Sequence, residues 1–143
     1  MLKLGVPVGL AVDGSASNDG SNMLEEIRVA YLLHRLQSSN AAPSGYDILK
    51  IATRGSARIL GRCDIGQLAV GKMADLFMIN SNDFELVGAD CDPKSMLATV
   101  GIKGNVALTM IGGEVVVKNG ILRLIDEEKI AARARIIANK LLN

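Results

Sequence analysis

The stretch that decides the fold runs from position 8 to position 22 and reads Val8-Gly9-Leu10-Ala11-Val12-Asp13-Gly14-Ser15-Ala16-Ser17-Asn18-Asp19-Gly20-Ser21-Asn22. In it a short apolar run ends abruptly in a carboxylate, and a loop rich in Gly, Ser and Asn follows. The apolar residues Val6, Val8, Leu10 and Val12, with Ala11 between them, predict a strand buried on both faces, as in a parallel sheet. Asp13 is then expected at the carboxyl end of that strand, where the loops of α/β folds converge on a substrate.

The polar loop has two interpretations. Its glycines and serines allow backbone amides to come close to a ligand, with Asn18, Asp19 and Ser21 lining a substrate pocket beside Asp13. In the structural alternative, Asp13 caps a turn, and the other polar side chains are solvated or cap the following helix. An isolated Asp-Gly pair is compatible with both interpretations, so evidence from the remainder of the chain has to distinguish them.

Composition limits the class of protein. The 143 residues suffice for one domain with a sizeable core, and 49% of them are hydrophobic. The 16 basic and 15 acidic residues are interspersed and leave a net charge of +1, so no basic surface for nucleic acid is expected. Cys63 and Cys91 show neither metal-ligand spacing nor a disulfide framework, as expected of reduced thiols in a cytosolic protein.

The N-terminus resembles a signal peptide only superficially. Gly5, Pro7 and Gly9 interrupt its apolar run, and no small-residue cleavage site precedes Asp13. No apolar run approaches the length of a bilayer span. We therefore expect a cytoplasmic protein that does not contact a membrane.

Two helical segments are expected after the loop. Asn22 is a suitable N-cap for a helix over residues 22–37, whose apolar stripe comprises Leu24, Ile27, Ala30 and Tyr31. His34, the only histidine, falls on or beside this stripe and is expected to be a packed or surface residue rather than a metal ligand. A second segment spans residues 46–60, weakened in its middle by Gly55 and terminated by Gly61.

The second half of the chain has the pattern of an antiparallel sheet. The pairs Gly112-Gly113 and Asn119-Gly120 each separate short β-prone runs and are typical of primed two-residue turns. They predict a three-stranded meander over residues 107–111, 114–118 and 121–124. Residues 74–79 are expected to form a further short strand and residues 94–99 a short helix. Asp126 is expected to cap a final helix with Ile130, Ala134, Ile137 and Leu141 on one stripe.

Three separated motifs together resemble a known family. They are Val12-Asp13-Gly14-Ser15-Ala16-Ser17-Asn18-Asp19, then Ala52-Thr53-Arg54-Gly55-Ser56-Ala57-Arg58-Ile59-Leu60-Gly61, then Asp64-Ile65-Gly66-Gln67-Leu68-Ala69-Val70-Gly71-Lys72-Met73-Ala74-Asp75-Leu76. The chain resembles the C-terminal portion of the metal-dependent amidohydrolase superfamily, in the branch that holds 8-oxoguanine deaminase and hydroxyatrazine aminohydrolases. The likeness covers essentially the whole chain. The Gly-Lys-x-Ala-Asp-Leu motif occurs throughout the superfamily, whereas the Asp-Gly-Ser-Ala-Ser-Asn-Asp loop is narrower.

The resemblance implies an α/β fold. Residues 1–62 would form the last βα unit of a (β/α)8 barrel, residues 63–125 the C-terminal half of the accompanying small β-sandwich, and residues 126–143 a terminal helix. A closed barrel needs roughly 200 residues or more, so this chain supplies only part of one. Lys72 and Asp75 match the Lys and Asp of the family's Gly-Lys-x-Ala-Asp-Leu motif. We expect them to be structural and to shape the turn into a strand of the sandwich.

The resemblance also implies an activity, the hydrolytic deamination, or a similar displacement, at a nitrogen heterocycle such as a purine or a triazine. The family aspartate that matches Asp13 is a catalytic proton shuttle and, in a complete barrel, a ligand of zinc or iron; Asn18 is a candidate substrate-binding residue. The family's histidine ligands lie upstream of the matching region, and one carboxylate cannot hold a catalytic zinc, which needs about three protein ligands. We therefore expect no metal on this chain alone and no activity without a complementing N-terminal part. The alternative is a non-catalytic module for self-association, consistent with a homo-oligomer.

Overall fold

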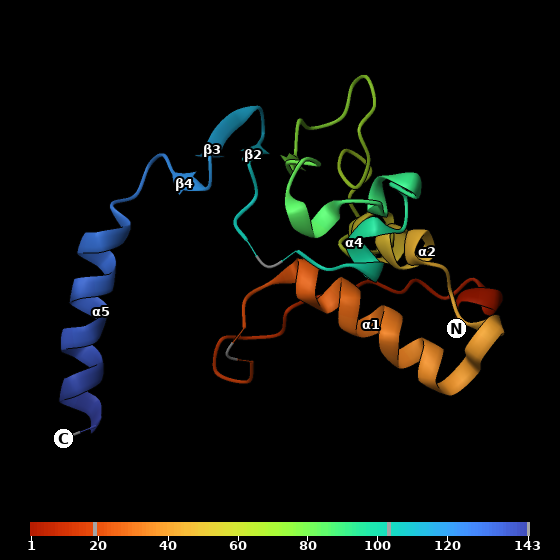
Figure 1. Ribbon diagram of the computed structural model, residues 1–143, viewed down its shortest axis with the longest axis horizontal. Coiled ribbons are helices and arrows are strands. Elements are labelled where there is room, and N and C mark those ends of the chain that lie inside the picture. The colour runs from red at the N-terminus through yellow and green to blue at the C-terminus, as the bar shows by residue number, and fades with distance from the viewer. Residues whose placement is uncertain (19, 103, 143) are drawn as a thin grey trace.

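The computed structural model describes residues 1–18, 20–102 and 104–142. Figure 1 shows a body of helices, a small sheet beside it and one helix at the C-terminal end. The helical body contains α1 (Met23–Ser38), α2 (Gly45–Lys50), a π-helical turn (Ile51–Gly55), α3 (Ser56–Ile59) and α4 (Met96–Thr99). Short 3₁₀ turns lie at Leu2–Leu4, Ser39–Ala41, Phe84–Leu86 and Ala89–Cys91.

The core of the helical body lies where α1, α2 and α4 meet. Ile27, Ile48 and Ala98, one from each helix, are each at most 2% exposed and form one buried cluster. Leu24, Ala30 and Tyr31 of the predicted stripe pack around this cluster, as do several residues of α2 and the π-helical turn. The predicted inward face of α1 is therefore confirmed, except that His34 is exposed rather than on the buried stripe.

Local side-chain chemistry explains where these helices start and stop. The Asn22 side chain accepts hydrogen bonds from the backbone N–H groups of Leu24 and Glu25, which confirms the predicted N-cap of α1. At the end of α3, Gly61 adopts a positive φ of 65° and donates its N–H to the Arg58 carbonyl. This left-handed termination is the one that glycine favours, so the predicted role of Gly61 is confirmed.

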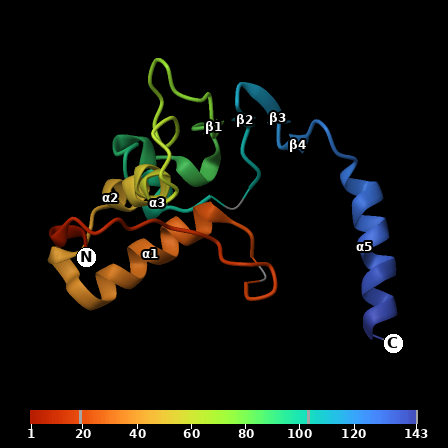
Figure 2. The same ribbon diagram turned by 180° about the vertical axis from the view of Figure 1, so that it is seen from behind.

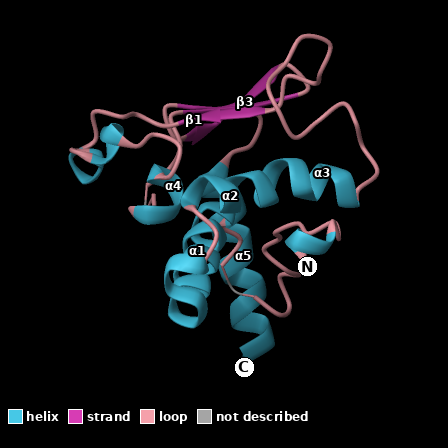
Figure 3. Ribbon diagram, turned by 90° about the vertical axis from the view of Figure 1, so that its right-hand side faces the viewer, coloured by secondary structure: helices cyan, strands magenta, loops and turns pink. Residues whose placement is uncertain are grey.

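The sheet has four antiparallel strands in the order β1-β2-β3-β4. Figure 3 shows it, in magenta, on one side of the helices. Its strands are β1 (Leu76–Met78), β2 (Leu108–Ile111), β3 (Glu114–Lys118) and β4 (Ile121–Leu122). The predicted meander is confirmed, although its last strand is shorter than expected. The central residues of both turns have positive φ, as the primed turns require: 57° and 88° at Gly112 and Gly113, 54° and 75° at Asn119 and Gly120. A register shift between Thr109 and Met110 marks a bulge against β3.

The prediction of a buried strand over residues 6–12 is wrong. This segment is extended but carries no strand, and Val6 remains 41% exposed. The reason is that the only described strands belong to the antiparallel sheet, so residues 6–12 have no neighbouring strand with which to form a ladder. In place of a sheet, the segment runs along the helical body (Figure 2).

The last helix, α5 (Glu127–Leu142), stands apart from the helical body in Figures 1 and 2. Asp126 caps it, because its Oδ1 accepts a hydrogen bond from the Lys129 N–H at 3.0 Å. The apolar stripe predicted for this helix is exposed rather than packed; Ile130 is 55% and Leu141 81% exposed. No helix in the described part of the chain combines the length and apolar character that a bilayer span needs.

Candidate functional site

Asp13 lies exposed at the end of the extended segment, where the chain turns into the polar loop. Its φ of 65° is in the left-handed region, which residues other than glycine seldom adopt, Asn and Asp being the usual exceptions. Its Oδ1 accepts a hydrogen bond from the Gly14 N–H at 2.7 Å. Oδ2 has no hydrogen-bond partner among the described residues, so one carboxylate oxygen remains available to a ligand or a water molecule.

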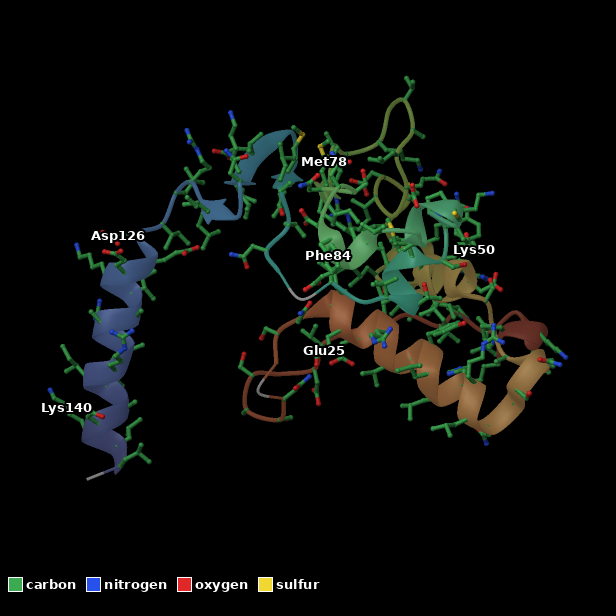
Figure 4. All side chains as sticks on the ribbon, viewed as in Figure 1. Glu25, Lys50, Met78, Phe84, Asp126 and Lys140 are labelled. Carbon is green, nitrogen blue, oxygen red and sulfur yellow. The ribbon has the colours of Figure 1, made fainter. Side chains whose placement is uncertain are left out.

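Asn18 connects the loop to both of its ends. Its Nδ2 donates to the carbonyl of Val12, the residue before Asp13, at 2.8 Å and to Oε1 of Glu26 in α1 at 3.2 Å. Its Oδ1 accepts a hydrogen bond from the Gly20 N–H at 3.1 Å. Asn18 is half-buried as a result. The side chain therefore ties the backbone beside Asp13 to the first turns of α1, where Glu25 also lies (Figure 4).

The segment before Asp13 is held by the helix that contains the π turn. The Ser56 Oγ accepts a hydrogen bond from the Leu10 N–H and donates to the Leu10 carbonyl, each at 3.2 Å. Gly55 allows the two chains to come this close, because a Cβ at that position would lie only 2.1 Å from the Val8 carbonyl oxygen. A Cβ on Gly9 would likewise lie 2.9 Å from the Ser56 Oγ. This close packing fixes the position of the backbone that leads to Asp13.

Other residues considered for the site lie elsewhere or outside the described residues. His34 lies on α1, roughly 16 Å along the helix axis from its first residue, and its Nδ1 donates to the Ala30 carbonyl at 3.0 Å. Cys63 and Cys91 are free and exposed. Asp19, expected to line the loop with Asn18, is not among the described residues. Ser21 is exposed in the loop.

Asp13 has no partner metal ligands grouped with it among the described residues. Over residues 1–18, 20–102 and 104–142, no three His, Cys, Asp or Glu side chains are grouped so that they could hold an ion. Asp13 offers one free carboxylate oxygen, and a zinc site needs about three protein ligands. Asp13 is thus an exposed acid in a hydrogen-bonded loop, and a carboxylate of this kind can chemically accept or deliver a proton.

The Gly-Lys-x-Ala-Asp motif lies away from Asp13, at the junction of helices and sheet. Asp75 Oδ1 accepts a hydrogen bond from the Gly112 N–H in the β2–β3 turn at 2.7 Å. Lys72 Nζ donates to the Cys63 carbonyl. Arg62 binds Asp64 through two hydrogen bonds, at 2.9 and 2.5 Å, and thereby lowers the pKa of the Asp64 carboxyl. Each of these bonds shapes a turn.

Sequence reasoning did not single out Ser56 and Glu26 as partners of the site. Ser56 lies 46 positions from Leu10, and a serine inside a helix carries no sign of so distant a partner. Glu26 lies in the first turn of α1, where the sequence alone indicates only a favourable interaction with the helix dipole. The adjacent Gly55 is the one available signal, since a glycine inside a helix often marks a close approach of another chain segment.

The chain belongs to the Amidohydrolase family, whose model matches residues 1–116. It is 47% identical over 137 residues to hydroxydechloroatrazine ethylaminohydrolase of Pseudomonas sp. (strain ADP), a match that covers 94% of this chain and 28% of that protein. It is 42% identical over 138 residues to the 8-oxoguanine deaminase of Pseudomonas aeruginosa, covering 96% of this chain and 30% of the relative.

A solved structure extends the comparison to three dimensions. Atrazine chlorohydrolase TrzN from Arthrobacter aurescens TC1, in a complex with zinc, matches with a TM-score of 0.87 and 38% identity. The match covers 94% of this chain and 30% of that one. The chain thus spans about a third or less of the length of these relatives, and its fold is that of one portion of theirs.

Proposed function

We propose that this chain is the C-terminal part of a metal-dependent hydrolase that acts on C–N bonds of a nitrogen heterocycle. In this proposal residues 1–62 form the last βα unit of a barrel, with the extended residues 6–12 becoming its strand only when a strand of the upstream part pairs with them. Residues 63–125 belong to the small sandwich and residues 126–143 are the terminal helix. Asp13 is the catalytic carboxylate that this part contributes. Purine-like and triazine-like molecules are the proposed substrates, because the relatives' names specify 8-oxoguanine and hydroxydechloroatrazine.

The observation that carries the proposal is the conformation at Asp13. Backbone strain in a non-glycine residue persists only where its surroundings hold it, and such residues cluster at functional sites. Here the strained residue is an exposed carboxylate that keeps one oxygen free, and two sets of hydrogen bonds hold the chain on either side of it.

The proposed activity requires residues that this chain does not contain. Its single histidine is on α1, with its Nδ1 already hydrogen-bonded. Zinc, present in the matching structure of TrzN, would have to be held mainly by residues upstream of this region. We therefore propose that these 143 residues alone bind no stoichiometric zinc or iron and are inactive. The missing ligands come from an upstream part, on the same polypeptide or on a separate one.

A chimera tests this proposal. In hydroxydechloroatrazine ethylaminohydrolase, the 137 matching residues are replaced by this chain, and release of ethylamine is measured with zinc or iron added. We expect activity and about one bound metal ion per chimera. Asp13→Asn, which keeps the size of the side chain, should reduce kcat by roughly 10²- to 10⁴-fold, the usual contribution of a general acid–base group.

Two results would contradict the proposal. One is an Asp13→Asn chimera as active as the parent chimera; the other is hydrolysis or stoichiometric metal binding by the lone chain. If the chimera does not fold, the chain co-expressed with the upstream part of the same relative gives the same readout, because complementation needs only that the two parts associate.

A second candidate function, a non-catalytic module for self-association, is favoured by exposed apolar surface. On α1, Leu33 is 58% and Leu36 85% exposed, and α5 adds Ile137 and Leu141. Apolar surface of this kind commonly marks an interface. Sedimentation of the lone chain distinguishes the two functions. A defined homo-oligomer that the upstream part cannot dissociate favours the module, whereas a species that converts to a one-to-one complex favours the enzyme part.

A further inference from the structure

The positive φ of Asp13 needs a cause within the chain. For an L-residue the left-handed conformation costs roughly 1–2 kcal/mol, and the Asp13 side chain offsets this only through its own bond to the Gly14 N–H. That bond lies within the turn and moves with it. It therefore does not determine where the carboxylate stands relative to the rest of the molecule.

Asn18 supplies the connection that the turn lacks. Its side chain is hydrogen-bonded to the backbone before Asp13, to the backbone of Gly20 farther along the loop and to Glu26 of α1. Both Nδ2 hydrogens are used, one on the Val12 carbonyl and one on Glu26 Oε1, while Oδ1 is used by the Gly20 N–H. The Val12 carbonyl belongs to the peptide that leads directly into Asp13, so its orientation sets φ of Asp13.

We propose that Asn18 is a positioning residue for Asp13, fixing the peptide that precedes it and thereby the direction of the carboxylate. This inference rests on the proposed function, in which Asp13 is catalytic. It differs from the expectation that Asn18 binds substrate, because the two donor hydrogens with which an amide would bind a heterocycle are already bonded within the chain.

Two parts of the Asn18 side chain are separable by mutation. Asn18→Ala removes all three hydrogen bonds. Asn18→Asp keeps an acceptor for the Gly20 N–H but removes both donors and places a carboxylate beside Glu26. If the bond to Val12 positions Asp13, the two variants should behave alike.

Glu26→Gln keeps the acceptor Oε1 and should be neutral, whereas Glu26→Ala should reproduce part of the effect. Ser17→Ala, in the same loop but with no side-chain hydrogen bond to a described residue, is the matched control.

The first measurement is structural and needs no activity. In the isotope-labelled chain, a positive φ at Asp13 gives a strong intraresidue NOE between its amide proton and its Hα. We expect this NOE in the parent and in Ser17→Ala, and its loss in Asn18→Ala and Asn18→Asp. Hydrogen exchange of the peptide that covers residues 12–20, measured in the chimera, should increase in the same two variants. An unchanged NOE and unchanged exchange in both would overturn the proposal.

The second measurement is kinetic and uses the chimera. We expect Asn18→Ala to lower kcat by roughly 10- to 100-fold, as a small misplacement of a catalytic group does, with KM changed less than about twofold. A raised KM with kcat preserved would instead make Asn18 a substrate-binding residue and overturn the inference. Asp13→Asn separates the two failures. If it abolishes activity while Asn18→Ala does not lower kcat, the proposed function stands and only this inference fails; if it has no effect, the proposed function itself fails.

Discussion

The hydroxyl of Ser56 engages both polar backbone atoms of Leu10, accepting from its N–H and donating to its carbonyl, with each Oγ distance 3.2 Å. The two residues are 46 positions apart. A hydroxyl has one proton to donate, and the Ile51 carbonyl, 3.4 Å from the Ser56 Oγ, is an alternative acceptor for that proton. These two hydrogen bonds take the place, at Leu10, of the backbone hydrogen bonds that the predicted strand would have made with a neighbouring strand.

Replacing Ser56 by Ala should therefore destabilise the chain. Two hydrogen bonds are lost and the part-buried backbone groups of Leu10 are left unpaired, which together should cost about 1–3 kcal/mol. Urea unfolding measures the change, and faster exchange of the Leu10 amide would locate it. Ser81→Ala, at an exposed serine with no side-chain hydrogen bond to a described residue, should stay within about 0.5 kcal/mol of the parent. Equal unfolding free energies for both variants would contradict the prediction.

Gly55→Ala should destabilise the chain even though Gly55 lies in a helical turn. In a helix interior, replacing Gly by Ala normally raises the unfolding free energy by up to about 1 kcal/mol. Here the added Cβ would meet the Val8 carbonyl oxygen at 2.1 Å, so the segment before Asp13 has to move. Overpacking of this kind costs typically 1–3 kcal/mol. The sign of the change in unfolding free energy, measured by denaturant titration, decides between these two effects.

Gly104 provides the comparison for this substitution. It has no positive φ, and a Cβ built there meets no atom within 4 Å. Gly104→Ala should therefore be neutral or slightly stabilising, because alanine has fewer unfolded conformations to lose. If both glycine variants are stabilised alike, residues 6–12 do not pack against the helix as the structure shows.

Locally determined elements were predictable from the sequence. The two hairpin turns need positive φ, and the pairs Gly112-Gly113 and Asn119-Gly120 provide it without help from distant residues. The cap of α1 by Asn22 depends likewise on atoms two and three positions away. Such elements form because a few neighbouring residues settle their geometry.

Elements that depend on distant partners were not predictable in this way. Residues 6–12 have the pattern of a buried strand, but a strand exists only where another strand pairs with it, and the described residues place none beside them. The position of Asp13 after an apolar run was recognised, whereas its tie through Asn18 to Glu26 was not. Side-chain hydrogen bonds across a loop leave no periodic pattern in the sequence, so only the structure reveals them.

Asp75 should stabilise the β2–β3 turn through its acceptor oxygen. It binds the Gly112 N–H at 2.7 Å across 37 positions of sequence, and it is exposed. Asp75→Ala should therefore cost about 1 kcal/mol in unfolding free energy. Asp75→Asn retains an oxygen acceptor and should recover most of the loss. Thermal unfolding of the two variants tests this, and equal losses would mean that the charge rather than the hydrogen bond matters.

Stability should also depend on pH through Asp47 at the start of α2. Its hydrogen bond to Lys50, and then those to the Ser44 side chain and backbone, lower the pKa of the Asp47 carboxyl from 3.8 to about 2. Because the folded-state pKa is below the unfolded one, the contribution is fully present above about pH 4 and is lost as pH falls toward 2. The Asp47 side chain is 43% exposed, so solvent screening reduces the contribution to about 1 kcal/mol.

Asp47→Asn tests this prediction, because it removes the titrating group while keeping a side chain of the same size. The parent should lose about 1 kcal/mol more unfolding free energy than the variant between pH 5 and pH 2.5, measured by urea unfolding at fixed ionic strength. Glu85→Gln, at an exposed carboxylate with no side-chain hydrogen bond to a described residue, controls for the change in net charge and should follow the parent. If the unfolding free energies of the parent and Asp47→Asn fall in parallel with pH, protonation of Asp47 does not weaken the folded state, and the prediction is wrong.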